Sequence, residues 1–440
     1  MKPHVTLTLR TPLQHIALPY WVDAITQAHL RREQFFPAVD ALFARHNLAF
    51  TATHEYRPAG SVWSPQEIAS GFDRVYRLVL QSNVNVPTEL IESIRLIPEV
   101  ERIRVGAIAE MDLQPRYAES LSVRTDRASR DAIFLDEAHA FSEGDEAITV
   151  AILDTGVDCD HPEYKDALLP GYDFVDILDG ATEFIGDYVG ADAIPEDEVG
   201  HGTHVAGIVT GKGKNMPRGV APRCRVLPVR VLAAMNKDGR KVGAGSVENI
   251  NNGVKWAIDN GADVINMSLG VRHTGGGLPH EEVIQYAQRK GVTVVAASGN
   301  DGRQEMYYPG AFPSVIAVGA ADDAGNVADF STFGDQVSFI APGVDVYSTS
   351  IEDGYAFSTG TSHAAPFVTG AVALMKSFAR SQGHELKDYQ VKHVLKHTAD
   401  KVDRNFKDRK AGYGRLNVAD GLRYLDYKLN SSRRRFHGYQ

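Results

Sequence analysis

Cysteine is scarce in this sequence, since only Cys159 and Cys224 occur among its 440 residues. Two thiols provide neither a disulfide framework nor a cysteine-based zinc cluster. Hydrophobic residues make up 43% and charged residues 23% of the chain, the balance of an ordinary globular protein. The length allows one large domain with a smaller one, or two or three domains of ordinary size.

An excess of positive charge is also missing. The chain has 46 Lys and Arg residues against 56 Asp and Glu residues, which gives a formal net charge of −10. Nucleic-acid binding draws on concentrated Lys and Arg, so this balance disfavours a nucleic-acid partner. A short basic run, Arg433 to Arg435, stands near the end of the chain, and we expect residues 429–440 to form a solvated basic tail.

Long apolar runs are absent as well. No stretch approaches the length of a membrane span, so no membrane partner is expected. The first residues, MKPHVTLTLRTPLQHIALPYW, lack the uninterrupted apolar core of a secretory signal. We therefore expect a cytoplasmic protein, or a secreted one if a signal belongs ahead of this sequence.

The first quarter of the chain has the pattern of a small α+β domain. Residues 75–80 and 100–105 are predicted to be strands, and residues 87–97 between them a short helix with one apolar side. A further helical stretch is expected around 35–46. We place this domain at residues 1–115, followed by a polar linker of mixed charge at 116–131.

After the linker the pattern changes to continuous apolar runs, which are typical of strands buried on both faces. These predicted strands are 147–153, 224–232, 262–269, 292–298 and 314–320. Helical patterns lie between several of them, so residues 132–428 are predicted to form a doubly wound α/β domain with a mainly parallel sheet and helices on both faces. Ligand chemistry in such a sheet belongs at the carboxyl ends of its strands.

Two acid–base candidates stand at such positions. Asp154 ends the first strand in AILDTGVD, where a residue that only caps a turn would also fit. His201 and His204 begin an apolar helix in GHGTHVAG. Their H-x-x-H spacing lacks the intervening Glu of a zinc helix and no third ligand stands out, so we expect no metal here.

A cluster of hydroxyl groups in FSTGTSHAAPFVTG raises the question of a nucleophile. Ser362 stands at the start of an almost wholly apolar helix, where free N–H groups and the helix dipole favour negative charge. A simple N-cap would explain the position of Ser362, but not the Asp and His upstream. Acyl transfer needs a nucleophile, a base and an orienting carboxylate, and Asn300 in AASGND offers a donor for an oxyanion.

The successive blocks AILDTGVD, GHGTHVAGIV, VINMSLG, AASGND and GTSHAAPFVTGAVAL resemble the signature segments of the subtilisin-like serine proteases, the subtilases. The resemblance covers about residues 131–425. The α/β-hydrolase alternative needs G-x-S-x-G and another residue order, and a nucleotide-binding α/β protein needs a G-x-G-x-x-G or P-loop motif that the chain lacks.

The resemblance implies a role for each candidate. Ser362 attacks the scissile carbonyl, His201 serves as general base and then acid, and Asp154 orients His201. Asn300 and the backbone N–H of Ser362 bind the oxyanion. No cofactor is needed for this chemistry, and the partners are protein or peptide substrates.

The resemblance also implies an edge strand that pairs with an extended substrate and a segment that forms the opposite side of the cleft. They are Gly243, Ala244 and Gly245 on one side and Ser268, Leu269 and Gly270 on the other. Tyr307 falls at the base of the first specificity pocket, where many relatives have a small residue. We therefore expect small or medium residues on the acyl side of the cut.

Two further positions depart from the family pattern. His363 follows the nucleophile where Met is usual, and we interpret it as a neutral space-filling side chain. The usual calcium-binding loop is not recognisable in GKGKNMPRGVAP, and Glu163 matches only one family ligand. Structural calcium is left open.

Subtilases commonly carry an N-terminal prodomain, and residues 1–115 resemble such a module. We expect this domain to act as an intramolecular inhibitor that is removed by self-cleavage between about residues 106 and 130. The alternatives are a permanent accessory domain, on a protease dedicated to one processing event, or a non-catalytic relative that only binds peptides.

Overall fold

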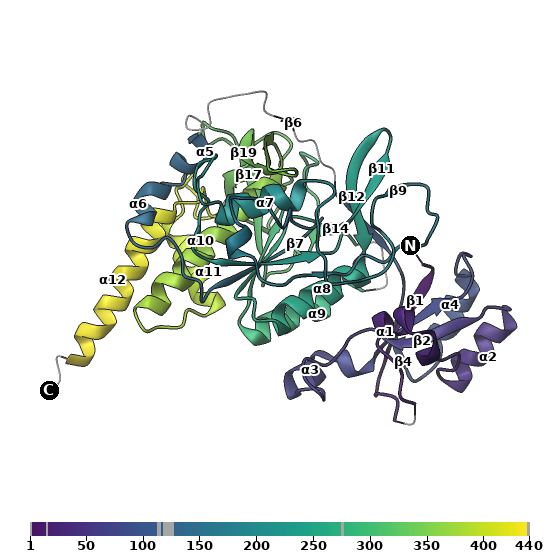
Figure 1. Cartoon of the computed structure of the whole chain (residues 1–440). Helices are drawn as coiled ribbons and strands as arrows, with labels where there is room; N and C mark the ends of the chain where they lie inside the picture. Colours follow the sequence, from purple (N-terminus) through teal and green to yellow (C-terminus); the bar gives the residue numbers. More distant parts are fainter. Residues whose placement is uncertain (1, 15, 112–115, 118–126, 274–276, 438–440) are drawn as a thin grey trace.

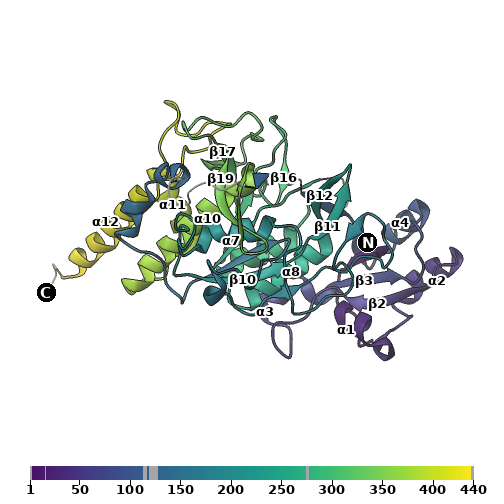
Figure 2. The same ribbon diagram turned by 45° about the horizontal axis from the view of Figure 1, so that its top comes forward.

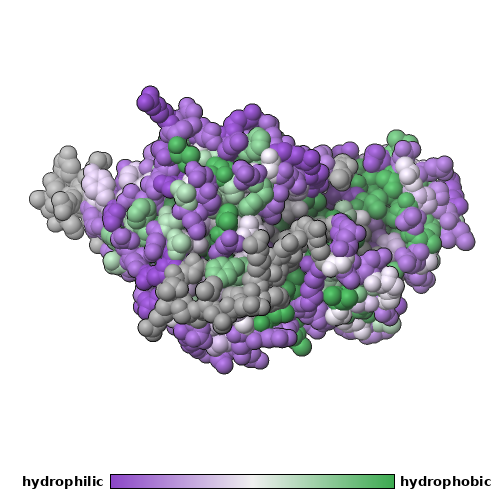
Figure 3. All heavy atoms as spheres, turned by 90° about the horizontal axis from the view of Figure 1, so that it is seen from above, coloured by the Kyte–Doolittle hydropathy of each residue, from purple (hydrophilic) through white to green (hydrophobic). Residues whose placement is uncertain are grey.

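The computed structural model describes residues 2–14, 16–111, 116–117, 127–273 and 277–437. The N-terminal domain lies beside a larger body, and the C-terminal helix projects from the side of that body remote from the N-terminal domain (Figures 1 and 2). Seen from above, the exposed surface is mostly hydrophilic, with separate apolar areas (Figure 3). None of the helices among the described residues is long and apolar enough to cross a membrane.

A seven-stranded parallel sheet forms the centre of the large body. Its strand order is β18-β17-β15-β13-β7-β10-β8. The strands are β7 (Thr149–Asp154), β8 (Tyr172–Asp173), β10 (Arg225–Arg230), β13 (Val264–Met267), β15 (Thr293–Ala297), β17 (Ile316–Ala321) and β18 (Val337–Pro342). Each of the five strands predicted from an apolar run is confirmed.

Both faces of this sheet are buried, as continuous apolar strands require. Along β7, Val150 and Ile152 join one hydrophobic cluster, and Ala151 and Leu153 join another on the opposite face. The first cluster includes α6 (Leu135–His139), α7 (His201–Thr210), α10 (Thr361–Ser381), α11 (Asp388–Thr398) and α12 (Val418–His437). The second includes α8 (Val247–Asp259) and α9 (Glu281–Lys290). The predicted doubly wound fold with helices on both faces is confirmed.

The N-terminal domain contains an antiparallel sheet of order β2-β3-β1-β4. Its strands are β1 (His4–Leu9), β2 (Phe50–His54), β3 (Val75–Leu80) and β4 (Val100–Val105). Helices α2 (Pro37–Arg45) and α4 (Thr88–Arg95) share a separate apolar cluster with this sheet, while α1 (Trp21–Thr26) and α3 (Pro65–Ser70) lie outside that cluster. The predicted strand–helix–strand unit and the helix near 35–46 are confirmed.

Smaller pairings connect the two parts. One sheet has the order β5-β12-β11-β9, with β5 (Ile108–Met111), β9 (Phe184–Ile185), β11 (Ala233–Lys237) and β12 (Arg240–Ser246). Another has the order β19-β20-β6, with β6 (Arg116–Tyr117), β19 (Val346–Ser350) and β20 (Gly354–Ser358). Chain segments on both sides of residues 112–115 thus add strands to the large body.

Two segments that were expected to be a linker and a tail contain regular secondary structure. The stretch 116–131, expected to be a linker, contains β6 and helix α5 (Ala128–Asp131), and Arg130 in α5 is buried against the large body. Helix α12 continues to His437, so most of the expected tail at 429–440 is helical.

The contact between the N-terminal domain and helices α8 and α9 combines an apolar cluster, in which the Phe72 and Tyr286 rings lie 5.0 Å apart, with buried polar contacts. Arg77 of β3 binds the Glu55 carboxylate through two nitrogen atoms and donates to Asn249 Oδ1 at 3.0 Å. Asn252 of α8 in turn donates to Glu55 Oε1 at 2.6 Å. All four side chains are buried, so this face of the N-terminal domain has specific polar partners on α8 in addition to the apolar contact.

Three ion pairs extend the same contact. His4 Nε2 lies 3.3 Å from Glu248 Oε2, Arg104 Nη2 lies 2.6 Å from Glu282 Oε1, and Lys255 Nζ lies 2.7 Å from Glu67 Oε1. Burial alone would raise the pKa of Glu248, but His4, Arg104 and Arg77 lower it to about 2. The carboxylates of the large body therefore keep their charge because the N-terminal domain supplies cations.

Candidate active site

Asp154 and His201 form a buried pair at the carboxyl end of the sheet. Asp154 is the last residue of β7, and His201 is the first residue of α7. His201 Nδ1 lies 2.6 Å from Asp154 Oδ1, which also accepts from the Thr155 N–H at 2.8 Å. A carboxylate can only accept, so the proton of a neutral His201 lies on Nδ1 and Nε2 keeps its lone pair.

The close approach of α7 to β7 depends on glycine. Gly202 follows His201, and a Cβ atom at Gly202 would lie 2.0 Å from the carbonyl oxygen of Gly156. Any larger residue would push the start of α7 away from the end of β7. The glycines in GHGTHVAG thus permit the short distance between Asp154 and His201.

Asp197 also belongs to this site, although no sequence motif pointed to it. Its Oδ1 accepts from Thr155 Oγ1 at 2.8 Å and from the N–H groups of Val199 and Gly200, each at 2.9 Å. Its Oδ2 accepts from the backbone and the hydroxyl of Thr203. Although these bonds favour the charged form, burial is the larger effect and raises the pKa of Asp197. Asp197 therefore fixes the start of α7 to the residue that follows Asp154.

Ser362 stands in the first turn of α10, beside the loop after β13. Its Oγ donates to the carbonyl of Ser268 at 3.1 Å, and Ser268 Oγ donates to the carbonyl of Ser362 at 2.6 Å. His363 packs its ring 5.1 Å from the ring of His201, measured between centroids. The first turns of α7 and α10 are thus in contact. His201 is the first residue of α7, and Ser362 directly precedes the contacting His363 in α10.

Asn300 lies on the other side of Ser362. Its Oδ1 accepts from the N–H and the hydroxyl of Thr361, both at 2.9 Å. Because an N–H donor requires an oxygen acceptor, these bonds assign the amide orientation and leave the NH2 group to donate. Asn300 and Ser362 line one pocket of about 210 Å³, together with Ser268 and Tyr307.

His363 and His204 form a buried aromatic contact behind the site. His363 Nε2 lies 2.6 Å from Ser358 Oγ, and its ring is 4.5 Å from that of His204. Burial, followed by the neighbouring imidazoles His204 and His201, lowers the pKa of His363 well below its ordinary value. His363 is therefore neutral, in agreement with its interpretation as a space-filling side chain.

The two expected substrate-binding segments lie on different elements. Gly243, Ala244 and Gly245 belong to β12, where they pair with Met111, Glu110 and Ala109 of β5. Ser268, Leu269 and Gly270 follow β13 and line the pocket that contains Ser362. The structure brings the second segment, Asn300 and Tyr307 together in that pocket. The first segment, in β12, is paired with β5 of the same chain.

The donors near His201 do not fit a zinc ion. His201 Nδ1 is bonded to Asp154, and His204 Nε2 lies 3.0 Å and 3.2 Å from the carbonyls of Val346 and Ala356. Within the described parts of the chain, no group of three or more His, Cys, Asp or Glu side chains is arranged to hold a metal ion.

Glu163, the candidate calcium ligand, is also already occupied. Its Oε2 accepts from the N–H groups of Gly213 and Lys214 at 2.8 and 3.1 Å, and its Oε1 accepts from the Asn215 N–H at 2.6 Å. These amides belong to the loop after α7. The carboxylate therefore holds the loop directly, and its oxygens are not free for calcium.

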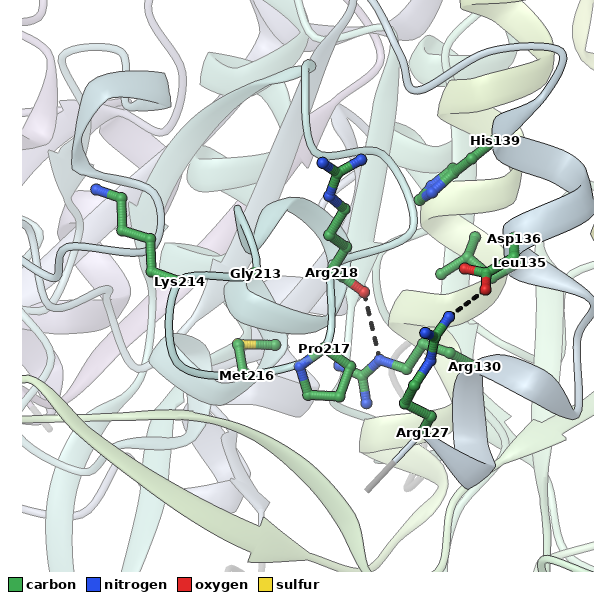
Figure 4. Close-up of a pocket in the computed structure, with 10 residues that line it drawn as sticks. All are labelled: Arg127, Arg130, Leu135, Asp136, His139, Gly213, Lys214, Met216, Pro217 and Arg218. Carbon is green, nitrogen blue, oxygen red and sulfur yellow. Dashed lines mark hydrogen bonds and ion pairs between the residues drawn. The ribbon is translucent and has the colours of Figure 1, made fainter. Parts of the chain in front are cut away.

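The charge around this loop also disfavours a cation. The loop forms one wall of a cavity of about 490 Å³, and helices α5 and α6 form the other (Figure 4). The lining of this cavity includes Lys214 and Arg218 from the loop and Arg127 and Arg130 from the helix side, with one carboxylate from Asp136. A calcium ion does not fit these residues.

The chain is similar to subtilisin-like proteases in both sequence and structure. The model of the family described as the subtilase family matches residues 145–414. The chain is 37% identical to a thermophilic serine proteinase of Bacillus sp. (strain AK1), over 66% of this chain and 65% of that protein. The chain thus spans just under two thirds of that relative.

Two other proteins show a similar level of sequence identity to this chain. Thermitase of Thermoactinomyces vulgaris is 36% identical over 60% of this chain and 85% of that protein. The structure of the prenylagaramide maturation protease PagA is 32% identical, with a TM-score of 0.54 over 66% of this chain and 98% of that chain. Because the family model matches more than half of the chain, the protein belongs to the subtilase family, the subtilisin-like serine endopeptidases.

Proposed function

We propose that the protein hydrolyses peptide bonds through an acyl-enzyme formed on Ser362. The observation that carries this proposal is the buried Asp154–His201 pair, whose geometry keeps Nε2 of His201 available as a base next to the first turn of α10. Ser362 Oγ attacks the scissile carbonyl carbon while His201 Nε2 takes its proton. His201 then gives that proton to the leaving amine. In the second half of the reaction His201 takes a proton from the water that attacks the acyl-enzyme and returns it to Ser362 Oγ.

Negative charge on the carbonyl oxygen needs donors that are fixed before the reaction. We assign this role to the NH2 group of Asn300 and the backbone N–H of Ser362. Two bonds from Thr361 fix the Asn300 side chain, and the start of α10 supplies further positive potential. The pocket that both groups line is where the substrate carbonyl would lie.

Labelling by a fluorophosphonate tests this assignment, because the reagent needs an activated serine. The wild type should be labelled on Ser362, and Ser362→Ala should neither label nor cleave peptides. Thr359→Ala is a matched control, since Thr359 is an exposed hydroxyl three residues away that bonds to Asp345. Absence of label on Ser362 in the mature protein would support the non-catalytic, peptide-binding alternative.

We further propose that the N-terminal domain inhibits the protease in the same chain. β5 pairs with β12 through Gly243, Ala244 and Gly245, the backbone positions expected to bind substrate. β6 pairs with β20, which leads into the loop before Ser362. A substrate strand and β5 would compete for one edge, and the tether gives β5 a high effective concentration.

Sequencing of N-termini tests the fate of this domain. The wild type should be cut between about residues 106 and 130, and Ser362→Ala should remain full length. A separately produced 1–115 fragment, which has its own apolar core, should inhibit the mature enzyme. A wild type that is fully active while uncut, with no effect of the fragment, would instead establish a permanent accessory domain.

A further inference from the structure

The ring of Tyr307 lies between the two walls of the pocket beside Ser362. One wall is Ser268–Gly270, and the other runs from Ala297 to Asp301. A Cβ atom at Gly270 would lie 2.9 Å from Tyr307 Cβ, and one at Gly299 would lie 2.6 Å from Tyr307 Cδ2. The two glycines therefore leave the space that the ring fills.

Charged neighbours hold the phenol group of Tyr307. β14 (Val271–Arg272) and β16 (Tyr307–Tyr308) pair with Arg272 opposite Tyr307. The Tyr307 hydroxyl donates to Asp301 Oδ2 at 2.6 Å and accepts from Arg272 Nε at 2.9 Å. Arg272 also bonds the same Asp301 oxygen through Nη2, so the three side chains form one set of mutual contacts. Glu305 lies 3.7 Å from Arg272 and Arg303 lies 3.6 Å from Asp301 at the edge of this set.

The phenol remains a proton donor in this set. Burial, and then the bond to Asp301, raise the pKa of Tyr307 above its ordinary value. Burial alone would raise the pKa of Asp301, but the bonds from Tyr307 and Arg272 lower it. At neutral pH the contact is therefore a charge-assisted hydrogen bond, which is stronger and more directional than a neutral one.

We propose that Arg272 and Asp301 form a latch that holds Tyr307 across the pocket and thereby restricts the acyl-side residue next to the cut to small side chains. This inference rests on the proposed function and identifies two residues that set its substrate class. The substrates are polypeptides with Gly, Ala or Ser at that position.

The latch is needed because the ring by itself is only half-buried. A half-buried ring without polar anchors can change rotamer when a larger substrate side chain enters. An anchored ring cannot, and the larger side chain then overfills a packed site. Cutting the latch should therefore widen the specificity even though the ring remains.

Matched peptides that differ only in Ala or Phe at the acyl-side position measure this effect as a ratio of kcat/KM values. Tyr307→Phe removes the hydroxyl and keeps the ring, and Arg272→Ala removes the donor to it. Both variants should raise the Phe-to-Ala ratio at least fivefold over the wild type. Arg303→Ala is the control, because Arg303 Nη2 lies 3.6 Å from Asp301 Oδ2, beyond hydrogen-bond distance. Its Phe-to-Ala ratio should stay within twofold of the wild type.

The outcomes separate the latch from the wider assignment. If Tyr307→Gly admits Phe while Tyr307→Phe and Arg272→Ala keep the wild-type ratio, the ring alone sets the limit and the latch is refuted. A wild type that prefers Phe, or an Arg303→Ala ratio that rises as much as that of Arg272→Ala, also overturns it. A wild type that neither cleaves nor is labelled on Ser362 refutes the proposed function itself.

Discussion

Two neighbouring ion pairs between β4 and the start of α9 provide a matched test of how the N-terminal domain is held. Arg104 Nη2 lies 2.6 Å from Glu282 Oε1, with side chains 10% and 11% exposed. Arg102 Nη2 lies 3.3 Å from Glu281 Oε2, with side chains 32% and 30% exposed. The pairs join the same two elements and differ in burial, and Glu282 also accepts from the Tyr56 hydroxyl at 3.1 Å.

The structure gives different costs for losing each arginine. Arg104→Ala would leave the buried Glu282 carboxylate without its cation, and breaking a buried pair in this way costs about 3–5 kcal/mol. Arg102→Ala removes a partly exposed pair, which is worth about 0.2–1 kcal/mol. The free energy of domain opening should therefore fall by about 2–5 kcal/mol more in Arg104→Ala, or roughly 30- to 3000-fold in the opening equilibrium.

Native-state hydrogen exchange of the α8 and α9 amides measures this opening. The variants should be made on Ser362→Ala, so that the chain stays in one piece. Arg104→Met combined with Glu282→Leu should recover part of the loss, because no buried charge is then left unpaired. Equal costs for Arg104→Ala and Arg102→Ala would refute the reasoning from burial.

Three further predictions concern the site and its support. Asn300→Ala should fold normally and lose about 2.7–4 kcal/mol of transition-state stabilisation in kcat/KM, the known cost of removing the oxyanion asparagine of a subtilisin. Glu163→Gln should lower the free energy of unfolding by about 1–3 kcal/mol in urea titrations, because loop amides lose a charged acceptor, and added calcium should not restore it. Stability should also fall on acidification from pH 6.5 towards pH 4. Burial lowers the pKa of His54 and His280 to about 4 and that of His204 to about 3, so the unfolded chain binds more protons in that window. Each histidine should cost up to about 2 kcal/mol at pH 5, and a flat urea midpoint between pH 7 and pH 5 would contradict this.

The sequence predicted the sheet and its acid–base pair because both depend on local patterns. Buried strands need continuous apolar runs, and Asp154 and His201 stand where a strand ends and a helix begins. Asp197 and Arg272 were missed because each acts through contacts with residues far along the chain, Thr155 for Asp197 and Tyr307 and Asp301 for Arg272, which no periodicity records. The pairing of β5 with β12 was likewise hidden, since a short edge strand has no pattern that names its partner.

The pairing of β5 and β6 with two different strands of the large body has a consequence for the rate of activation. The chain leaves β12 at Met111 and reaches β20 at Arg116, so a cut between these strands would leave each new end paired with its own strand. Both new ends would then stay attached to the large body until one of the two strands leaves. The lag before activity appears would thus be governed by the departure of one strand and would be insensitive to modest changes in the rate of bond cleavage.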